Sequence, residues 1–319
     1  MLRSRKLWLV ALTFGAAAAL AAPVRAAEID KLTPADAQAV IVFNVRQTID
    51  SPLAKKKGIV DKMKDWISAN PQAKGAIAAL GLDLTKDIES VTIAVNSFAD
   101  LQTGKPEKML VIVRGNFDPD RFEAFAKTSD TIKITKEGNL TVYENKDKGE
   151  TSYATLIGKN IMAVSPSKDY LLQSVKNVGG GSKDLVKAGA KADGKNSMWM
   201  AVVVTDEMRK AMADNPQLKG FANKLESITS GVNVSDSIVL DLNVNTTDGD
   251  AAKAIETQIN AFLPFIRATA EADEKNGALA KEIFSNLKIA AGPTGLNVNL
   301  KVSEDTLDKI IKASGKFPK

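Results

Sequence analysis

Ser165 and Lys168 have the spacing of a serine nucleophile and its lysine base. Enzymes that use this S-x-x-K pattern place it at the start of a helix and carry a partner triplet such as Lys-Thr-Gly or Ser-Asp-Asn. Neither triplet occurs in this sequence. The alternative is a helix cap, in which a serine oxygen accepts a hydrogen bond from a backbone N–H of the first helical turn.

An internal match favours the helix cap. Residues 167–171 (Ser-Lys-Asp-Tyr-Leu) align with residues 303–307 (Ser-Glu-Asp-Thr-Leu), so Glu304 replaces the lysine. The positions that agree are a capping serine, an acid that complements the positive end of the helix dipole, and a leucine for the buried side of the helix. We therefore predict that both segments begin helices and that Ser165 and Lys168 are not catalytic.

Two acidic clusters could bind a hard cation such as Ca²⁺ or Mg²⁺, which takes several carboxylate oxygens. They are Asp118-Pro119-Asp120 with Glu123, and Asp248-Gly249-Asp250 with Glu256. Neither cluster has the spacing of an EF-hand loop. Each lies between an expected strand and an expected helix, where an Asp caps the helix and a Pro suits the first helical position. We predict helix caps here, and neither a metal site nor a cofactor.

The chain contains no His and no Cys. Ser-His-Asp and Cys-His nucleophile systems, imidazole general bases and the usual zinc sites are therefore excluded. Carboxylate, lysine, tyrosine and hard-metal chemistry remain. Because no convincing set of these residues is found, we predict a protein that is not an enzyme, with a carboxylate-based hydrolase as the catalytic alternative.

Residues 1–26 have the layout of a secretory signal peptide: a basic head, an apolar run from Leu7 to Ala22, and a small-residue cleavage site. We expect cleavage, export to the bacterial periplasm or beyond, and no membrane span in residues 27–319. These residues carry 39 Lys and Arg against 38 Asp and Glu. Basic and acidic side chains alternate, so the sequence gives no basic patch for nucleic acid.

Several short segments recur in the same order, which predicts an internal duplication. Asn70-Pro-Gln-Ala-Lys-Gly75 matches Asn215-Pro-Gln-Leu-Lys-Gly220, and Glu89-Ser-Val-Thr92 matches Glu226-Ser-Ile-Thr229. An Asn-Pro pair is typical of a helix start. We predict a first α+β half at 27–178, a Gly-rich joint and short helix at 179–196, and a second α+β half at 197–319.

Hydrophobic periodicity predicts that each half is a β-α-β-β-α-β-type unit, an antiparallel-rich sheet with helices on one face. The expected strands lie near residues 39–45, 90–96, 108–114, 131–135, 140–145, 151–157, 160–164, 198–204, 228–234, 237–245, 287–290 and 295–302. The expected helices lie near residues 53–68, 71–80, 118–128, 167–177, 206–213, 216–226, 248–286 and 303–313.

The two expected sheets differ in their patterning. Strands 237–245 and 295–302 alternate between apolar and polar residues, which predicts a sheet with one solvated face. Residues 109–113 (Met-Leu-Val-Ile-Val) are apolar at every position, so the side chains on both sides of this strand are apolar. Both faces of the first sheet should therefore be covered. Docking of the two halves would supply the second cover.

Two surfaces are candidates for ligand binding. Asparagine amides on the polar face of the second sheet could bind a polar ligand such as a glycan, because each amide both donates and accepts; they are Asn243, Asn245, Asn297 and Asn299. The other candidate is the apolar run from Phe262 through Phe265 to Ile266. Pro264 should break or kink the helix there, which would leave the run as a buried corner. The alternative is an exposed lip for a lipid or a partner.

The signal-like segment, the lack of Cys and His, and two degenerate α+β halves together resemble uncharacterised exported bacterial proteins. The resemblance is one of layout and implies no functional residue. We expect an exported, non-enzymatic envelope protein that binds an envelope partner or a small ligand through the cleft between the halves or through the open sheet face. The alternative is a periplasmic carrier of a hydrophobic small molecule or lipid.

Overall fold

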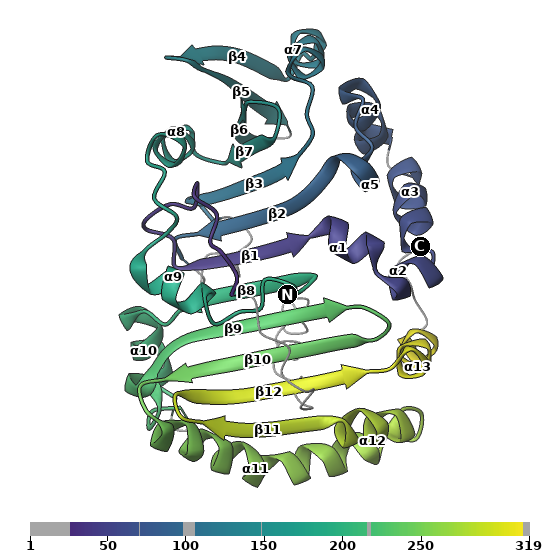
Figure 1. Ribbon diagram of the computed structural model, residues 1–319, viewed down its shortest axis with the longest axis vertical. Helices are drawn as coiled ribbons and strands as arrows, with labels where there is room; N and C mark the ends of the chain where they lie inside the picture. Colours follow the sequence, from purple (N-terminus) through teal and green to yellow (C-terminus); the bar gives the residue numbers. More distant parts are fainter. Residues whose placement is uncertain (1–25, 70, 98–105, 148, 216–217, 315–319) are drawn as a thin grey trace. The chain divides into compact units, whose positions relative to one another are not determined.

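The computed structural model describes residues 26–319 apart from 70, 98–105, 148, 216–217 and 315–319 (Figure 1). The predicted signal peptide lies outside the described residues except for Ala26, and the predicted Asn-Pro helix starts at Asn70 and Pro216 lie outside them too. The chain forms two compact units, described separately below. The N-terminal unit comprises Ala26–Lys191 and Ser197–Val202, and the C-terminal unit comprises Ala192–Asn196 and Val203–Lys319.

Antiparallel strands form the frame of the N-terminal unit (Figure 1). In spatial order they are β8 (Met198–Val203), β1 (Ala39–Asn44), β2 (Ile88–Val95), β3 (Met109–Gly115), β7 (Ile161–Ser165), β6 (Glu150–Ile157), β5 (Leu140–Asp147) and β4 (Ile132–Glu137). Strand β8, at the start of the predicted second half, pairs with β1, so that Val40 lies opposite Ala201.

The strands of the C-terminal unit are also antiparallel and lie in the order β11 (Leu287–Gly292), β12 (Gly295–Val302), β10 (Ile238–Thr246) and β9 (Leu225–Val234). Its helices are α10 (Asp206–Ala213), the 3₁₀ helix η1 (Ala222–Lys224), α11 (Gly249–Glu271), α12 (Gly277–Ser285) and α13 (Glu304–Ser314). Helix α11 packs against β10, β11 and β12. Among the described residues, no helix is both long and apolar enough to cross a bilayer.

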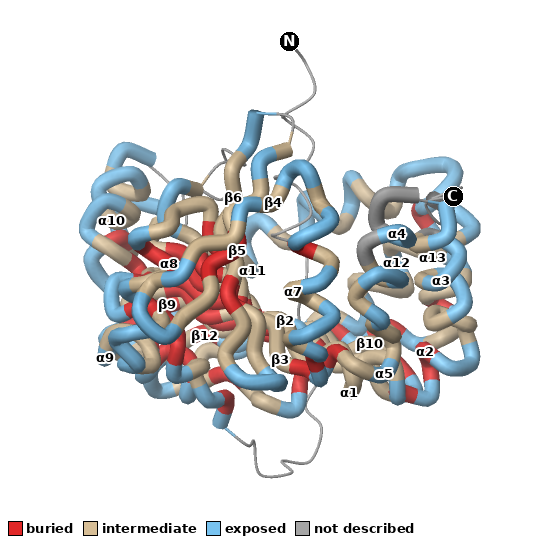
Figure 2. The backbone as a smooth tube through the Cα atoms, turned by 90° about the horizontal axis from the view of Figure 1, so that it is seen from above, coloured by how far each residue is buried: buried red, intermediate tan, exposed pale blue. Residues whose placement is uncertain are grey.

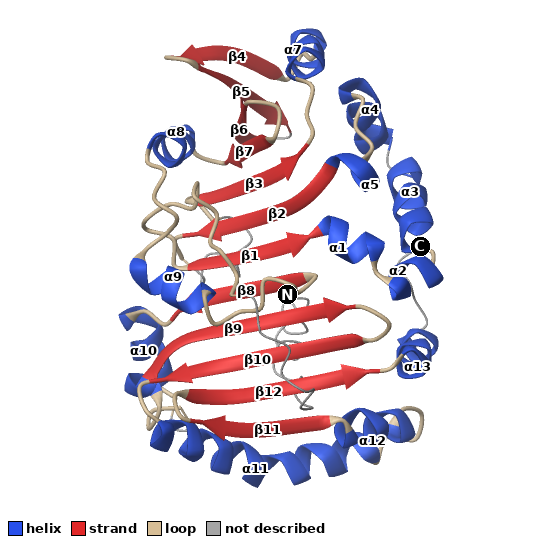
Figure 3. Ribbon diagram, viewed as in Figure 1, coloured by secondary structure: helices blue, strands red, loops and turns tan. Residues whose placement is uncertain are grey.

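Local sequence sets the helix boundaries of the N-terminal unit (Figure 3). The helices are α1 (Val45–Asp50), α2 (Pro52–Lys56), α3 (Ile59–Ala69), α4 (Pro71–Leu80), α5 (Leu84–Asp87), α7 (Pro119–Thr128), α8 (Lys168–Lys176) and α9 (Lys183–Gly189). Ser51 caps α2 by accepting a hydrogen bond from the Ala54 N–H, and Pro52 follows it. The helix predicted at 53–68 is divided at Gly58, whose positive φ of 61° suits glycine.

The core of the N-terminal unit lies where α8 packs on β3, β6 and β7 (Figure 2). It is formed by fully or almost fully buried apolar side chains: Leu32, Leu110, Ile112, Val142, Ala163, Tyr170 and Leu171. The hydroxyl of Tyr170 donates a hydrogen bond to Asp36 Oδ1 at 3.1 Å, so its polar end is satisfied at the edge of the core. Burial raises the pKa of this phenol.

Both units contain the order strand, strand, helix, strand, strand, helix. In the N-terminal unit these elements are β2, β3, α7, β6, β7 and α8, with the hairpin β4–β5 inserted; in the C-terminal unit they are β9, β10, α11, β11, β12 and α13, with α12 inserted. The neighbour orders, β2-β3-β7-β6 and β9-β10-β12-β11, correspond. The structure is thus a mixed α+β fold with an antiparallel sheet and helices, while the duplication itself stays a prediction.

Two predicted features of the C-terminal unit are wrong. In the described residues of the helix expected at 216–226, the structure has the short 3₁₀ helix η1 (Ala222–Lys224) and no α-helix. Strand β9 already begins at Leu225, where the buried positions alternate through Ser227 and Thr229 with the period of a strand. The expected break at Pro264 is absent too, since α11 continues through that residue. Periodicity alone could not show that the segment before Leu225 forms turns.

The glycine run at 179–181 is held to the start of the N-terminal unit. Gly180 and Gly181 have φ values of 70° and 84°, which favour glycine. Their N–H groups donate to the carbonyl oxygens of Lys31 and Thr33 at 3.0 and 2.9 Å. These glycines therefore have a specific conformational role, and the flexible joint predicted at 179–196 stays a prediction.

Candidate functional site

The structure places Ser165 and Lys168 in separate interactions. Ser165 ends β7, is 1% exposed, and its Oγ accepts a hydrogen bond from the Ser167 N–H at 3.1 Å. Ser167 Oγ accepts from the Tyr170 N–H at 3.3 Å, as the N-cap of α8. The matching segment at 303–307 begins a helix in the same way, because Ser303 Oγ accepts a hydrogen bond from the Thr306 N–H at 3.1 Å. The predicted helix starts are confirmed.

Lys168 has the electrostatics of an ion pair. Its Nζ lies 2.5 Å from Glu137 Oε1, and the hydrogen bond between them raises the pKa of the lysine and lowers that of Glu137. A general base needs a pKa near the working pH, so a catalytic lysine would show the opposite shift. The arrangement therefore disfavours a Ser-Lys catalyst.

The first aspartate of each acidic cluster caps a helix, as predicted. Asp118 Oδ1 accepts from the N–H groups of Asp120 and Arg121 at 3.0 and 3.2 Å. Asp248 Oδ1 accepts from the Ala251 N–H at 2.8 Å, and its Oδ2 binds Lys224 Nζ at 2.7 Å. Within the described part of the chain, no group of three or more carboxylates has the geometry to hold a metal ion.

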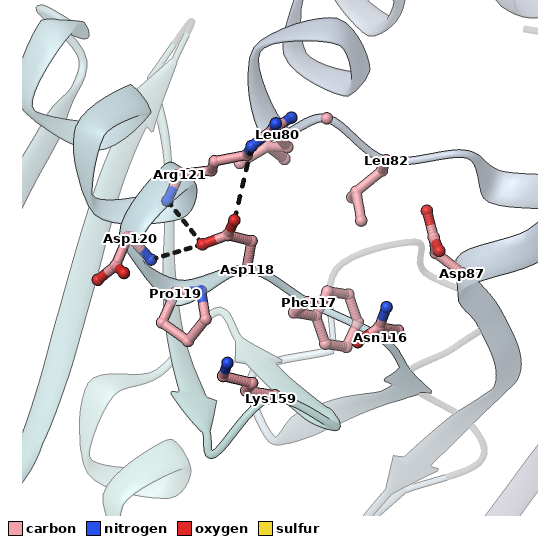
Figure 4. Close-up of a pocket in the computed structure, with 11 residues that line it drawn as sticks. Leu80, Leu82, Asp87, Asn116, Phe117, Asp118, Pro119, Asp120, Arg121 and Lys159 are labelled. Atoms are coloured by element: carbon pink, nitrogen blue, oxygen red, sulfur yellow. Dashed lines mark hydrogen bonds and ion pairs between the residues drawn. The ribbon is translucent and has the colours of Figure 1, made fainter.

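One open pocket of about 410 Å³ lies beside Asp118 in the N-terminal unit (Figure 4). Its lining is polar and of mixed charge: Leu80, Gly81, Leu82, Asp87, Asn116, Phe117, Asp118, Pro119, Asp120, Arg121 and Lys159. Arg121 reaches back to Asp118 at 3.5 Å, and Asp87 Oδ2 accepts from the Asp83 N–H at 2.7 Å. Because these groups already hold turns and helix starts, the pocket is not the best candidate for a site.

The asparagines proposed for ligand binding lie on β10 and β12, and three of them form hydrogen bonds across these two strands. Asn297 Nδ2 donates to Asn243 Oδ1 at 2.6 Å, and Asn299 Nδ2 donates to Asp241 Oδ1. These pairs are directly opposite each other across the antiparallel strands. Burial raises the pKa of Asp241. The amides thus form cross-strand pairs, which reduces their capacity for an external ligand.

Asn245 stands apart from these pairs, opposite Gly295. It is 6% exposed, and its Nδ2 has no hydrogen-bond partner among the residues that the structure describes. The strand register shifts between Asn245 and Thr246, which takes the side chain out of the simple alternation. The sequence pattern gave no sign of this irregularity.

The apolar run on α11 is exposed, so the predicted buried corner is wrong. Phe262, Phe265 and Ile266 are 49%, 75% and 46% exposed. Pro264 lies within the continuous helix, whose other side packs against β11 and β12. Phe262 and Phe265 therefore do not line an enclosed cavity, and the exposed-lip alternative describes their position.

A larger apolar surface lies on the sheet of the N-terminal unit. Residues that lie directly opposite each other on antiparallel strands share a face of the sheet. Ile41 of β1 lies opposite Ile93 of β2, Ile93 opposite Val111 of β3, and Val111 opposite Val164 of β7, so these four residues mark one face. We call its half-exposed or exposed members the apolar sheet face; they are Ile41, Phe43, Val91, Ile93, Met109, Val111, Val113, Ala154, Leu156, Met162, Val164, Met198 and Met200.

The two faces of this sheet differ in burial. Leu110 and Ile112, on the α8 side, are 0% exposed, whereas Met109, Val111 and Val113, which alternate with them along β3, are partly exposed. The apolar sheet face ends at β5, where Tyr143 lies opposite Ala154 and packs edge-on against Phe122 of α7, with ring centroids 4.7 Å apart. Residues 109–113 are apolar on both sides of the strand, which predicted cover on both faces, whereas Met109, Val111 and Val113 remain partly exposed.

Methionine is concentrated on the apolar sheet face. Of the eight methionines in the chain, Met109, Met162, Met198 and Met200 lie on it. Methionine is flexible and polarizable, and it is common on surfaces that adapt to varied apolar ligands. Sequence reasoning missed this grouping because the four residues come from β3, β7 and β8, which only the strand register brings onto one face.

No protein-family model and no curated protein sequence matches the chain. Its fold is similar to solved structures of a protein named TP0453. Crystal form IV is 12% identical over 89% of this chain and 96% of that chain, with a TM-score of 0.50. Forms I and III are 13% and 12% identical, cover 93% of this chain and 98% and 100% of theirs, and both have a TM-score of 0.48. At these identities the likeness to form IV concerns the fold alone.

Proposed function

We propose that this chain is an exported, non-enzymatic protein that binds an elongated apolar molecule, such as a lipid acyl chain, on the apolar sheet face. The observation that carries the proposal is that these strands bury one face, whereas most apolar residues of the other face stay partly exposed. Only at one end of that second face are the apolar side chains buried, at Ala39, Val95 and Val202. A large contiguous apolar surface on a soluble protein commonly marks a ligand groove or an interface.

The chemistry of the surface favours a flexible apolar ligand. Its members are aliphatic side chains, methionines and the 37%-exposed Phe43, so the face offers dispersion contacts and no charge. Methionine side chains can adjust to an acyl chain with many rotamers. This supports the hypothesis of a hydrophobic carrier, although at a different place from the Phe262 run.

The polar-ligand hypothesis has less support. The amides of Asn297 and Asn243 already satisfy each other, so a glycan would have to replace that hydrogen bond. Export rests on the signal-like layout of residues 1–26. Mass spectrometry of the mature protein, with a new N-terminus at residue 27, tests it independently of ligand binding.

Methionine oxidation tests the binding face. Peroxide should oxidise the half-exposed Met109, Met162, Met198 and Met200, and a saturating fluorescent fatty acid should slow their oxidation. Met208 and Met212 on α10 are internal controls, whose oxidation rate should not change. Equal oxidation rates at Met162 and Met200 with and without ligand would contradict the proposal.

A variant whose side chains keep nearly the same size tests the affinity of the apolar sheet face for a fatty acid. Val111→Thr/Val164→Thr replaces two neighbouring members of the face with near-isosteric polar residues, whose hydroxyls can reach water. We expect weaker binding of the fluorescent fatty acid, by about tenfold. The matched control is Val178→Thr, because Val178 is 59% exposed elsewhere in the unit. Unchanged affinity in the double variant would rule out this face.

A further inference from the structure

The outward side of helix α11 in the C-terminal unit is free of charge over several turns. From Ala254 to Ala272 the exposed residues are uncharged apart from Arg267, whose side chain is 43% exposed. The exposed uncharged residues include Ala261, Phe262, Phe265, Ile266, Ala268 and Thr269. A helix that faces water normally presents charged and polar side chains on its outer side. The outer side of α11 therefore has the composition expected of a buried side.

The charged residues of this stretch point the other way. Glu256 Oε1 accepts from the Ala291 N–H of β11 at 3.2 Å. Arg267 Nη2 donates to the Phe284 carbonyl of α12 at 2.6 Å, and its Nε lies 3.6 Å from Glu271. These contacts fix the rotation of the helix, so that Phe262, Phe265 and Ile266 stay on the solvent side.

The exposed apolar area on the outer side of α11 and its lack of charge indicate what kind of partner it contacts. Phenylalanine has roughly 150–250 Å² of surface, so the exposed parts of Phe262, Phe265 and Ile266 amount to about 300 Å². A stable protein interface buries about 800 Å² on each partner and has charged groups at its rim. A lipid interface requires only a few inserted apolar side chains and no complementary charge.

We propose that the outer side of α11 is a membrane-contact surface, which inserts Phe262, Phe265 and Ile266 shallowly among the acyl chains of a lipid bilayer. Binding is driven by apolar burial and is independent of anionic lipid, because the partly exposed Arg267 is already held by Glu271 and by the Phe284 carbonyl. This surface belongs to the C-terminal unit, and the proposed ligand-binding face belongs to the N-terminal unit.

Sedimentation with phosphatidylcholine vesicles tests the proposal. The wild-type protein should bind these uncharged vesicles, and binding should change little between low and high salt. Phe262→Ser/Phe265→Ser should lower the partition coefficient by about tenfold or more. The matched control is Val178→Ser/Val186→Ser, two exposed apolar residues of the N-terminal unit, which should bind like the wild type.

Three outcomes would overturn the proposal. They are equal binding by the wild type and the Phe262/Phe265 variant, release of the wild type by salt, and a dimer in light scattering that the same variant abolishes. Fluorescence gives a second readout, since Phe265→Trp should show a blue shift when vesicles are added and none without them. Because fatty-acid binding should persist in the Phe262/Phe265 variant, failure of this proposal is distinguishable from failure of the proposed function.

Discussion

Nζ of Lys168 lies 2.5 Å from Oε1 of Glu137, and this ion pair joins the first turn of α8 to the end of β4. The lysine that completes an S-x-x-K pattern in the sequence is therefore a cation held by a carboxylate. The neighbouring serine, Ser167, is occupied by the Tyr170 N–H. Residues that suggest catalysis in the sequence thus position a helix in the fold.

Replacing Ser167 tests its role as a cap. Ser167→Ala should lower the free energy of unfolding by about 1 kcal/mol, because the Tyr170 N–H loses its partner. Ser167→Asp should retain most of the stability, since an Asp also caps. Urea unfolding followed by circular dichroism measures both. A neutral Ser167→Ala variant would show that the hydrogen bond does not stabilise the fold.

The two faces of β3 should respond differently to truncation. Leu110→Ala should cost about 2–5 kcal/mol, because Leu110 is 0% exposed and truncation leaves a cavity in the core. Met109→Ala, one residue away on the half-exposed face, should cost about 1 kcal/mol or less. Chemical denaturation gives both values. Equal losses would mean that the second face is as closely packed as the first.

Gly115 at the end of β3 should not tolerate a side chain. A Cβ at this position would lie 2.1 Å from the carbonyl oxygen of Asp87, and backbone atoms there cannot rotate away. Gly115→Ala should therefore destabilise the protein by about 1–3 kcal/mol. Gly75→Ala in α4 is the contrasting variant, because its Cβ would meet nothing within 4 Å. It should stabilise the helix by about 0.5–1 kcal/mol in the same thermal unfolding assay.

Asp248 should make stability depend on acid pH. The hydrogen bond and ion pair with Lys224, together with the Ala251 N–H, lower its pKa from 3.8 to about 2. A carboxyl with a depressed folded pKa contributes stability that is fully present above pH 4 and is lost as pH falls from about 4 to 2. Asp248→Asn keeps a capping oxygen but removes this titration. Melting temperatures measured at pH 2, 3, 4 and 6 should therefore fall less steeply for the variant.

The same measurement distinguishes Asp248 from other acids. Asp83 also has a pKa lowered to about 2, first by its side-chain hydrogen bond to Thr85. Asp83→Asn should flatten the same pH range independently, because Asp83 lies in the N-terminal unit and Asp248 in the C-terminal unit. An Asp248→Asn profile parallel to that of the wild type would contradict the assigned pKa.

Most elements of the fold could be predicted from local pattern. Strand β12 alternates through Leu296, Val298 and Leu300, and the structure buries these residues. Helix starts at Asp118 and Ser167 could also be predicted, because a cap involves atoms only two or three residues apart. Short-range chemistry of this kind is encoded in neighbouring residues, and it does not depend on how the strands are arranged.

The position of Phe262 and Phe265 could not be predicted this way. An apolar run with a proline has the composition of a buried corner. In the structure, however, the rotation of α11 about its axis turns Phe262 and Phe265 towards solvent. That rotation depends on Glu256 meeting β11 and Arg267 meeting α12, which are contacts with residues more than fifteen positions away. The candidate site on the sheet was hidden for a similar reason, because Met162 and Met200 share a face only through strand register.

By itself, the sequence determined the mixed α+β class, the capping serines and aspartates, and the exclusion of imidazole and thiol chemistry, because each of these follows from composition or from residues a few positions apart. The tertiary structure alone decided which apolar residues remain in contact with water. Ile112 and Val113 are adjacent and equally hydrophobic, yet α8 covers the first and leaves the second half-exposed. Whether a side chain is buried depends on which element packs against it, and that element comes from a distant part of the chain.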